Sequence, residues 1–455
     1  MEMVLEFLRD VLSQPALLIG IMSCIGLIAL KRPFHKVMTG TLKPILGYLM
    51  LAAGAGVIVN NLDPLGKMIE HGFHITGVVP NNEAIVAVAQ KVLGVETMSI
   101  LVVGLLMNLC IARFTKFKYV FLTGHHSLFM ACLMSAVLGT AGLSGMELIL
   151  VGGFLMGAWS AISPAIGQSY TSKVTEGDEI AIGHFGSLGY YLSAWVAKYV
   201  GKADDSTEDI EIPEKWGFLR DSTLSTALTM IVFYLIAAFA AGSEFVATLS
   251  GDMSPYLYAV MSAMNFAVGV TIVYSGVRMI LGDLIPAFQG IATKIIPNAI
   301  PAVDCAVFFT YAPTAVVLGF ISSFIGGIIG MLILGAVGGV LIIPGLVPHF
   351  FCGATAGIYG NATGGRHGAA VGAFLNGLAI TFLPALALPV LGQLGFQNTT
   401  FGDADFAVMG LVLGHTFEWI GMAGIYGIVA IAALVLIIPN FIKTKGKVIN
   451  YVEEE

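Results

Sequence analysis

Long apolar runs are the feature that most constrains the fold of this sequence. Ser99–Ala112, Ala227–Ala241 and Ile425–Pro439 are almost free of charge. A helix needs about 20 predominantly apolar residues to cross a bilayer. Over the whole chain 57% of residues are hydrophobic and 11% are charged, whereas a soluble domain has about 25% charged residues. The sequence therefore predicts an all-α polytopic membrane protein, and the continuity of the runs argues against the alternating pattern of a β-barrel.

Basic clusters give the expected orientation of the chain. One cluster, Lys31–Lys36, follows the first apolar span, and another, Lys443–Lys447, follows the last. The positive-inside rule places both in the cytoplasm, with the N-terminus outside and the C-terminus inside. This orientation needs an odd number of crossings, and we expect about eleven transmembrane helices. Breaks at Asn60–Pro64 and Gly282–Pro286 and short apolar segments predict re-entrant half-helices, at Ala84–Leu93 and Phe406–Trp419, and surface amphipathic helices.

Two short stretches place a carboxylate within this apolar chain. Pro80–Glu83 and Pro301–Asp304 each carry a proline three residues before an acid, between strongly apolar segments. Charged groups at membrane depth are costly and are usually functional. Alternatively, backbone amides at a broken helix end satisfy each carboxylate, with no ligand involved. We expect Pro301, Asp304, Glu83 and the neighbouring Asn82 to form one polar site, although Asn82 is also a common turn residue.

The two halves of the chain align at a nearly constant offset. An offset of 222 residues aligns Gly47 with Gly269, Gly54 with Gly276 and Pro64 with Pro286, and an offset of 221 aligns Pro80 with Pro301 and Glu83 with Asp304. Inverted repeats with broken helices place a substrate site near the bilayer midplane. We therefore expect one membrane unit, residues 1–455, built from two inverted repeats at about 15–200 and 222–442.

Histidines at two Gly-His steps are further candidates for the site. His125 and His184 each begin an apolar or amphipathic segment, and an imidazole can donate to or accept from a hydroxyl. The alternative is a core histidine with a backbone partner. No His or Cys pair has the tight spacing of metal ligands, and no phosphate-binding loop of the G-x-x-x-x-G-K-[ST] type is present. The sequence thus predicts no metal, no cofactor and no nucleotide hydrolysis by this chain.

Several motifs together resemble the ascorbate-type EIIC membrane subunits of the phosphotransferase system, a group related more distantly to the galactitol type. The resemblance covers nearly the whole chain. It rests on Lys43-Pro44-Ile45-Leu46-Gly47-Tyr48, Ala53-Gly54-Ala55-Gly56, Thr123-Gly124-His125, Ile182-Gly183-His184, Val303-Asp304-Cys305-Ala306, Tyr311–Val317 and Leu341-Ile342-Ile343-Pro344-Gly345.

The resemblance implies a homodimer in the bacterial cytoplasmic membrane. Each eleven-span subunit would have a scaffold domain for dimerisation and a core domain that carries L-ascorbate, or a close sugar or polyol analogue, across the bilayer. A phosphocysteine on a separate cytosolic EIIB protein, recharged by EIIA, would phosphorylate the substrate. This chain would have no catalytic residue, which leaves open whether it counts as an enzyme, and no nucleic-acid partner. His125, His184 and Asp304 match positions that contact the ligand in this family.

The sequence departs from the ascorbate members at three positions. Phe129 and Phe185 stand where glutamines are expected beside the two histidines, and Glu83 stands where a tyrosine is expected. We therefore include Phe129, Phe185 and Glu83 among the candidate substrate contacts. Because a second carboxylate repels an anionic ligand unless it is protonated, a neutral pentitol or hexitol stays open as the substrate. An ion-coupled secondary transporter, driven by H⁺ or Na⁺, is the alternative function, and a membrane receptor is a third.

Overall fold

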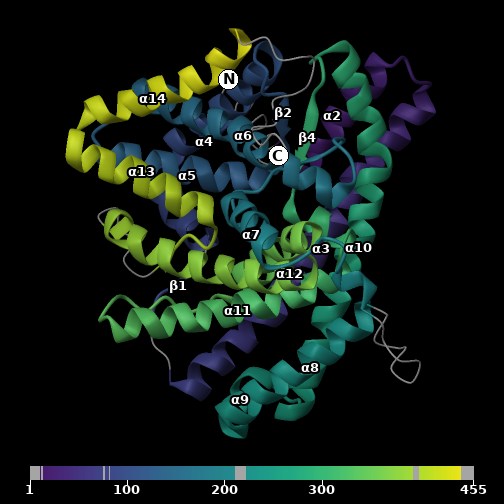
Figure 1. The fold of residues 1–455 in the computed structure, drawn as a ribbon, viewed down its shortest axis with the longest axis vertical. Coiled ribbons are helices and arrows are strands. Elements are labelled where there is room, and N and C mark those ends of the chain that lie inside the picture. Colours follow the sequence, from purple (N-terminus) through teal and green to yellow (C-terminus); the bar gives the residue numbers. More distant parts are fainter. Residues whose placement is uncertain are drawn as a thin grey trace.

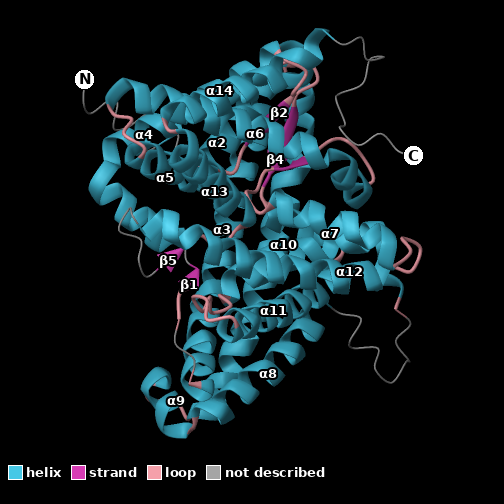
Figure 2. Cartoon of the chain, turned by 60° about the vertical axis from the view of Figure 1, so that its left-hand side comes forward, coloured by secondary structure: helices cyan, strands magenta, loops and turns pink. Residues whose placement is uncertain are grey.

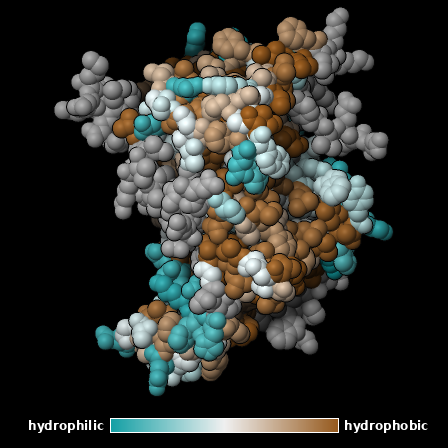
Figure 3. All heavy atoms as spheres, turned by 90° about the vertical axis from the view of Figure 1, so that its left-hand side faces the viewer, coloured by the Kyte–Doolittle hydropathy of each residue, from teal (hydrophilic) through white to brown (hydrophobic). Residues whose placement is uncertain are grey.

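The computed structural model describes residue 11 and residues 14–74, 77–80, 82–210, 222–392 and 399–441. Helices make up most of these residues, and the strands are short (Figures 1 and 2). Hydrophobic side chains cover much of the face in Figure 3, and hydrophilic ones gather toward its lower end. These observations confirm the predicted all-α polytopic membrane fold.

Long helices follow one another along the chain, and brief extended segments precede some of them. The helices are α2 (Pro15–Ala29), α3 (Phe34–Phe73), α4 (Asn82–Phe114), α5 (Gly124–Thr140), α6 (Gly145–Thr175), α7 (Ser187–Val200), α8 (Ser222–Ala241), α9 (Ser243–Ser250), α10 (Pro255–Lys294), α11 (Pro313–Ala336), α12 (Leu346–Gly392), α13 (Ala404–Ile420) and α14 (Met422–Ile437). Short 3₁₀ helices are η1 (Thr207–Asp209), η3 (Cys305–Thr310) and η4 (Ile438–Phe441). The strands are β1 (Val79–Pro80), β2 (Tyr119–Phe121), β3 (Ala181–Ile182), β4 (Ile300–Val303) and β5 (Thr399–Thr400).

Fewer helices than expected have the length and composition of a membrane span. Among the described residues seven qualify, or up to eight if the bent pair Met230–Ala241 and Ser243–Ser250 is one span, against the eleven expected. The helix α12 is in fact two helices, because Gly364 and Gly365 between them are non-helical. Others, such as α5 and α13, are shorter than a full span.

Two predicted breaks are wrong. The helix α3 continues through Pro64, and α10 continues through Pro286. Likewise Ala84–Leu93 is no separate half-helix, since it belongs to the 33-residue helix α4. Proline is tolerated inside membrane helices because neighbouring groups satisfy the backbone carbonyl that it frees. The turn-forming residues in these segments therefore do not end the helices, because the segments lie between long apolar runs.

The helices pack as two groups. The first, called here the α3 group, contains α2, α3, α8, α9 and α10, and the second, the α12 group, contains α4 to α7 and α11 to α14. Figure 1 shows α3 and α10 side by side, and α11 and α12 side by side next to them. Apolar side chains meet at the boundary, for example Phe233 with Phe320 and Phe266 with Phe350. This boundary is therefore held largely by non-directional hydrophobic packing.

Glycines bring α3 and α10 into backbone contact. A Cβ on Gly47 would lie 2.8 Å from the Gly276 carbonyl oxygen, and one on Gly54 would lie 2.7 Å from that of Gly269. Small residues allow membrane helices to approach this closely. The crossing is reciprocal. Gly47, the earlier glycine in α3, contacts Gly276, the later one in α10, whereas Gly54 contacts the earlier Gly269. The two helices therefore run antiparallel.

Short parallel strands precede the N-termini of several helices and pair with one another. Strand β4 lies between β2 and β3 in a three-stranded sheet, with Pro301 opposite Val120. Strand β1 pairs with β5, and Val78 next to it forms a bridge with Ile342. Within a bilayer these extended segments must satisfy one another's backbone groups. Because each segment leads within a few residues into the N-terminus of a helix, the strands also gather those helix starts together.

Candidate functional site

The candidate site lies where the N-termini of several helices meet. Each of these helices follows a strand of one of the two small sheets. From the three-stranded sheet come His125, His184 and Asp304, and from the two-stranded sheet come Asn82 and Asp403. The two sets touch at His184, whose Nδ1 lies 3.9 Å from Asp403 Oδ1. The structure thus brings both sequence-predicted stretches, Pro80–Glu83 and Pro301–Asp304, to one region. Figure 2 shows β2 and β4 in the upper half of the molecule and β1 and β5 below them, as two separate sheets.

His125 is held between a carboxylate and a phenol. Its Nε2 lies 3.3 Å from Asp304 Oδ2, and its Nδ1 lies 3.1 Å from the Tyr48 hydroxyl. The other oxygen of Asp304 accepts a hydrogen bond of 3.0 Å from the backbone N–H of Ala306, at the start of η3. Because an ionised carboxylate only accepts, we assign the proton of neutral His125 to Nε2, so that Tyr48 donates to Nδ1. The His125 side chain is 38% exposed and that of Asp304 is 9% exposed.

Two further histidines are fixed by backbone donors. The Gly186 N–H donates to His184 Nδ1 at 3.1 Å, and the Phe185 N–H donates to His126 Nδ1 at 3.3 Å. The two rings are in contact, with centroids 3.8 Å apart. Since a backbone N–H can only donate, each Nδ1 must accept, and a neutral ring then carries its proton on Nε2. Both histidines therefore present Nε2–H donors.

The geometry alone would allow a metal ion, but the histidine nitrogens are engaged. Ligand atoms of His126, His184 and Asp403, and of His184, Asp304 and Cys305, lie within 4.8 Å of one another. However, the lone pairs on Nδ1 of His126 and His184 already accept backbone hydrogen bonds. A metal would need another tautomer of each ring, since only a deprotonated nitrogen binds a metal. These residues therefore suit hydrogen bonding better than metal coordination.

Asp403 is a central residue that the sequence analysis missed. Its Oδ2 accepts a 2.5 Å hydrogen bond from Asn82 Nδ2, and its Oδ1 accepts one of 2.8 Å from the Cys352 thiol. Asn82 in turn accepts from the Gly402 N–H at 2.9 Å, which joins the starts of α4 and α13. A sequence signal did exist. Gly402-Asp403 follows Gly183-His184 at an offset of 219 residues, close to that of the repeat.

The remaining candidates differ in where they point. Phe129 lies edge-on to the His125 ring, with centroids 5.8 Å apart, on the same helix α5. Phe185 is fully buried and stacks on Phe121 at 4.6 Å, so its ring belongs to the packing behind the site. Pro301 is buried in β4 and positions Asp304. Glu83 lies in the first turn of α4, but its side chain falls outside the described part of the structure.

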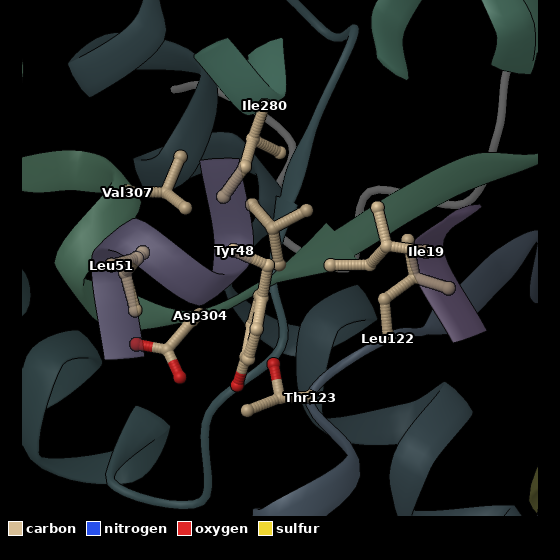
Figure 4. A pocket seen from close by; sticks show the side chains of 9 residues that line it. Ile19, Tyr48, Leu51, Leu122, Thr123, Ile280, Asp304 and Val307 are labelled. Atoms are coloured by element: carbon tan, nitrogen blue, oxygen red, sulfur yellow. The ribbon is translucent and has the colours of Figure 1, made fainter. Parts of the chain in front are cut away.

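A small pocket adjoins His125 at the boundary between the two helix groups. It is lined by Ile19, Tyr48, Leu51, Leu122, Thr123, Ile280, Val303, Asp304 and Val307. Figure 4 shows the polar atoms of Tyr48, Thr123 and Asp304 at one end of the pocket, with apolar side chains around the rest. The Thr123 hydroxyl is buried and has no hydrogen-bond partner among the described residues. The pocket therefore has one polar end, and in this conformation its space is about that of one water molecule.

The comparison with known families decides the class of the protein. Residues 10–405 match the model of the family EIIC-GAT, described as the PTS system sugar-specific permease component. The chain belongs to this family. The permease is 28% identical over 416 residues to the "Ascorbate-specific PTS system EIIC component" of Mycoplasma pneumoniae (strain ATCC 29342 / M129 / Subtype 1). That match covers 78% of this chain and 62% of the relative, so the permease spans about three fifths of the relative's length.

Proposed function

We propose that this permease component binds L-ascorbate, or a close sugar or polyol analogue, and carries it inward for phosphorylation by EIIB. The observation that carries the proposal is the His125–Asp304 pair, with Nε2 and Oδ2 3.3 Å apart beside a pocket that has one polar end. Family membership supports a sugar substrate, and the ascorbate-specific relative supports the choice of sugar. EIIB would supply the phosphoryl group, so we assign no catalytic residue to this chain.

The chemistry of the cluster suits a ligand with several hydroxyls. Asp304 accepts hydrogen bonds from ligand hydroxyls, whereas His126 and His184 donate from Nε2 to ligand oxygens. The starts of η3, α5 and α7 also meet here, and the partial positive charge at a helix N-terminus favours an anion. Asp304 and Asp403 already receive N–H or thiol hydrogen bonds, which spread their charge. A singly charged ascorbate is therefore compatible with this cluster.

The proposed architecture follows from the internal symmetry. Two observations support inverted repeats at about 15–200 and 222–442: the reciprocal glycine contacts of α3 with α10, and the central strands β1 and β4, which begin 221 residues apart. We propose that the α3 group is the scaffold of a homodimer and that the α12 group is the core that moves with the substrate. The orientation proposed is N-terminus outside and C-terminus in the cytoplasm of a bacterium.

Uptake into membrane vesicles tests this function. The vesicles hold the permease and are loaded with phosphoenolpyruvate and the soluble phosphotransferase proteins, and radiolabelled ascorbate, pentitols and hexitols are added outside. We expect the substrate to accumulate in phosphorylated form and only when EIIB is present. Accumulation of unmodified substrate without EIIB, abolished by an uncoupler, would instead identify an ion-coupled secondary transporter and overturn the proposal.

A further inference from the structure

Tyr48 reaches across the boundary between the two helix groups. It stands on α3, in the α3 group, and its hydroxyl lies 3.1 Å from Nδ1 of His125, on α5 in the α12 group. The side chain is buried, with 7% of its surface exposed. Around it the boundary is apolar, because Ile19, Leu51 and Ile280 of the α3 group line the pocket together with Leu122, Val303 and Val307, which lie just after β2, in β4 and in η3. Tyr48 thus adds a directional contact to a non-directional interface.

We propose that the chain Tyr48–His125–Asp304 is a latch that holds the α12 group against the α3 group and that substrate releases. Asp304 Oδ1 is occupied by the Ala306 N–H, which leaves Oδ2 for His125. A ligand hydroxyl that binds Oδ2 therefore competes with His125 for the same oxygen. Once His125 loses this partner, its ring is no longer held in the orientation and tautomer that accept the Tyr48 proton.

An alternative partner for Tyr48 lies within the same pocket. The buried Thr123 hydroxyl has no hydrogen-bond partner among the described residues, and Figure 4 shows it at the end of the pocket where the Tyr48 hydroxyl lies. Leaving a buried hydroxyl unpaired is costly. A nearby free hydroxyl lowers the cost of breaking the bond between Tyr48 and His125. Because Thr123 stands at the N-terminus of α5, on the same side of the boundary as His125, a bond from Tyr48 to Thr123 eases only the loss of the His125 contact and must itself break before the groups separate.

Thiol labelling at the boundary tests the latch without any transport assay. Leu51 is 4% exposed and lines the pocket from α3, so Leu51→Cys reacts with a maleimide only when the groups separate. The background chain carries Cys24→Ser and Cys110→Ser, because these two cysteines are the less buried ones. Adding Tyr48→Phe removes the hydrogen bond, and we expect labelling to become about fivefold faster, the effect of losing one such bond.

Tyr234→Phe is the matched control. The Tyr234 hydroxyl donates to the Asn61 carbonyl oxygen, and both residues belong to the α3 group. This substitution also removes one tyrosine hydrogen bond, but none across the boundary, so labelling of Leu51→Cys should stay at the parental rate. If Tyr48→Phe labels no faster than Tyr234→Phe, the latch is refuted.

A second experiment distinguishes release of the latch by substrate from a general loosening of the packing around Tyr48. This experiment rests on the proposed function. Saturating ascorbate or the best-binding polyol should speed labelling in the Tyr48 protein but add nothing in Tyr48→Phe, since the latch is already open. Equal acceleration by ligand in both proteins would show that Tyr48 has only a packing role and would overturn the coupling. If no tested sugar binds while the unliganded difference persists, the latch stands and the proposed substrate fails.

Discussion

His125 on α5 and Asp304 at the start of η3 approach to 3.3 Å, although 179 residues separate them in the sequence. The pairing of β2 with β4 explains the contact, because the two residues follow the ends of adjacent parallel strands. The two halves of the chain therefore each contribute one member of the central pair. This relationship makes the site sensitive to side-chain chemistry at Asp304 and to the packing that aligns the halves.

Asp304→Asn should weaken substrate binding strongly while the protein stays folded. The amide keeps the shape of the side chain but loses the charge that strengthens hydrogen bonds to ligand hydroxyls and to His125. We expect affinity to fall about 10- to 100-fold, as when a charged hydrogen-bond partner worth about 1.5–3 kcal/mol is lost. Ligand-induced thermal shifts measure it. Asp63→Asn, on an exposed Asp63–Lys67 pair, is the control, and wild-type affinity in Asp304→Asn would remove Asp304 from the site.

Phe129→Gln should change the relative affinity for different sugars. The new amide would stand beside the His125 ring, where it can exchange hydrogen bonds with a ligand. We expect the ratio of ascorbate to polyol affinity to rise, by about fivefold for one added hydrogen bond. Phe185→Gln is the comparison: its ring is buried against Phe121, so the mutant should lose stability without changing that ratio. The opposite pattern would reverse the roles of the two phenylalanines.

Asn82→Ala should destabilise the junction of α4 with α13. The substitution removes the hydrogen bonds of Asn82 to Asp403 and to the Gly402 N–H. Leaving such partly buried groups unpaired costs about 1–3 kcal/mol each, so the thermal midpoint in detergent should fall. Asn440→Ala serves for comparison, because the Asn440 amide donates to the Leu436 carbonyl oxygen only four residues earlier. This substitution should shift the midpoint less. Equal shifts would contradict a special role for Asn82.

Gly54→Ala and Gly56→Ala, two residues apart on α3, should have opposite effects. A Cβ on Gly54 would lie 2.7 Å from the Gly269 carbonyl oxygen and 2.8 Å from the Val273 nitrogen, whereas nothing lies within 4 Å of one on Gly56. Overpacking against backbone costs about 1–3 kcal/mol, while alanine in an uncrowded helix gains about 0.5–1 kcal/mol over glycine. Thermal unfolding should therefore occur earlier for Gly54→Ala and later for Gly56→Ala, and a stable Gly54→Ala would argue against the close crossing.

Much of the membrane fold could be predicted because hydropathy is a local property. Runs such as Ile425–Pro439 require a bilayer whatever their partners are, and the acid at Asp304 and the Gly-His steps at His125 and His184 stand out against that background. Helix breaks were harder to predict. Pro64 and Pro286 resemble break points, yet the helices continue through both, because packing against other helices outweighs the cost of proline.

The sequence by itself determined the apolar environment and three of the central side chains, His125, His184 and Asp304. Only the tertiary structure decided which groups meet: Tyr48 with His125, Asn82 with Asp403, and Phe185 with Phe121 behind the site. These contacts depend on strand pairing and helix crossing between distant segments, and the direction of each side chain follows from that geometry. Local composition carries no such information, because a hydrogen bond depends on position and angle as well as on residue type.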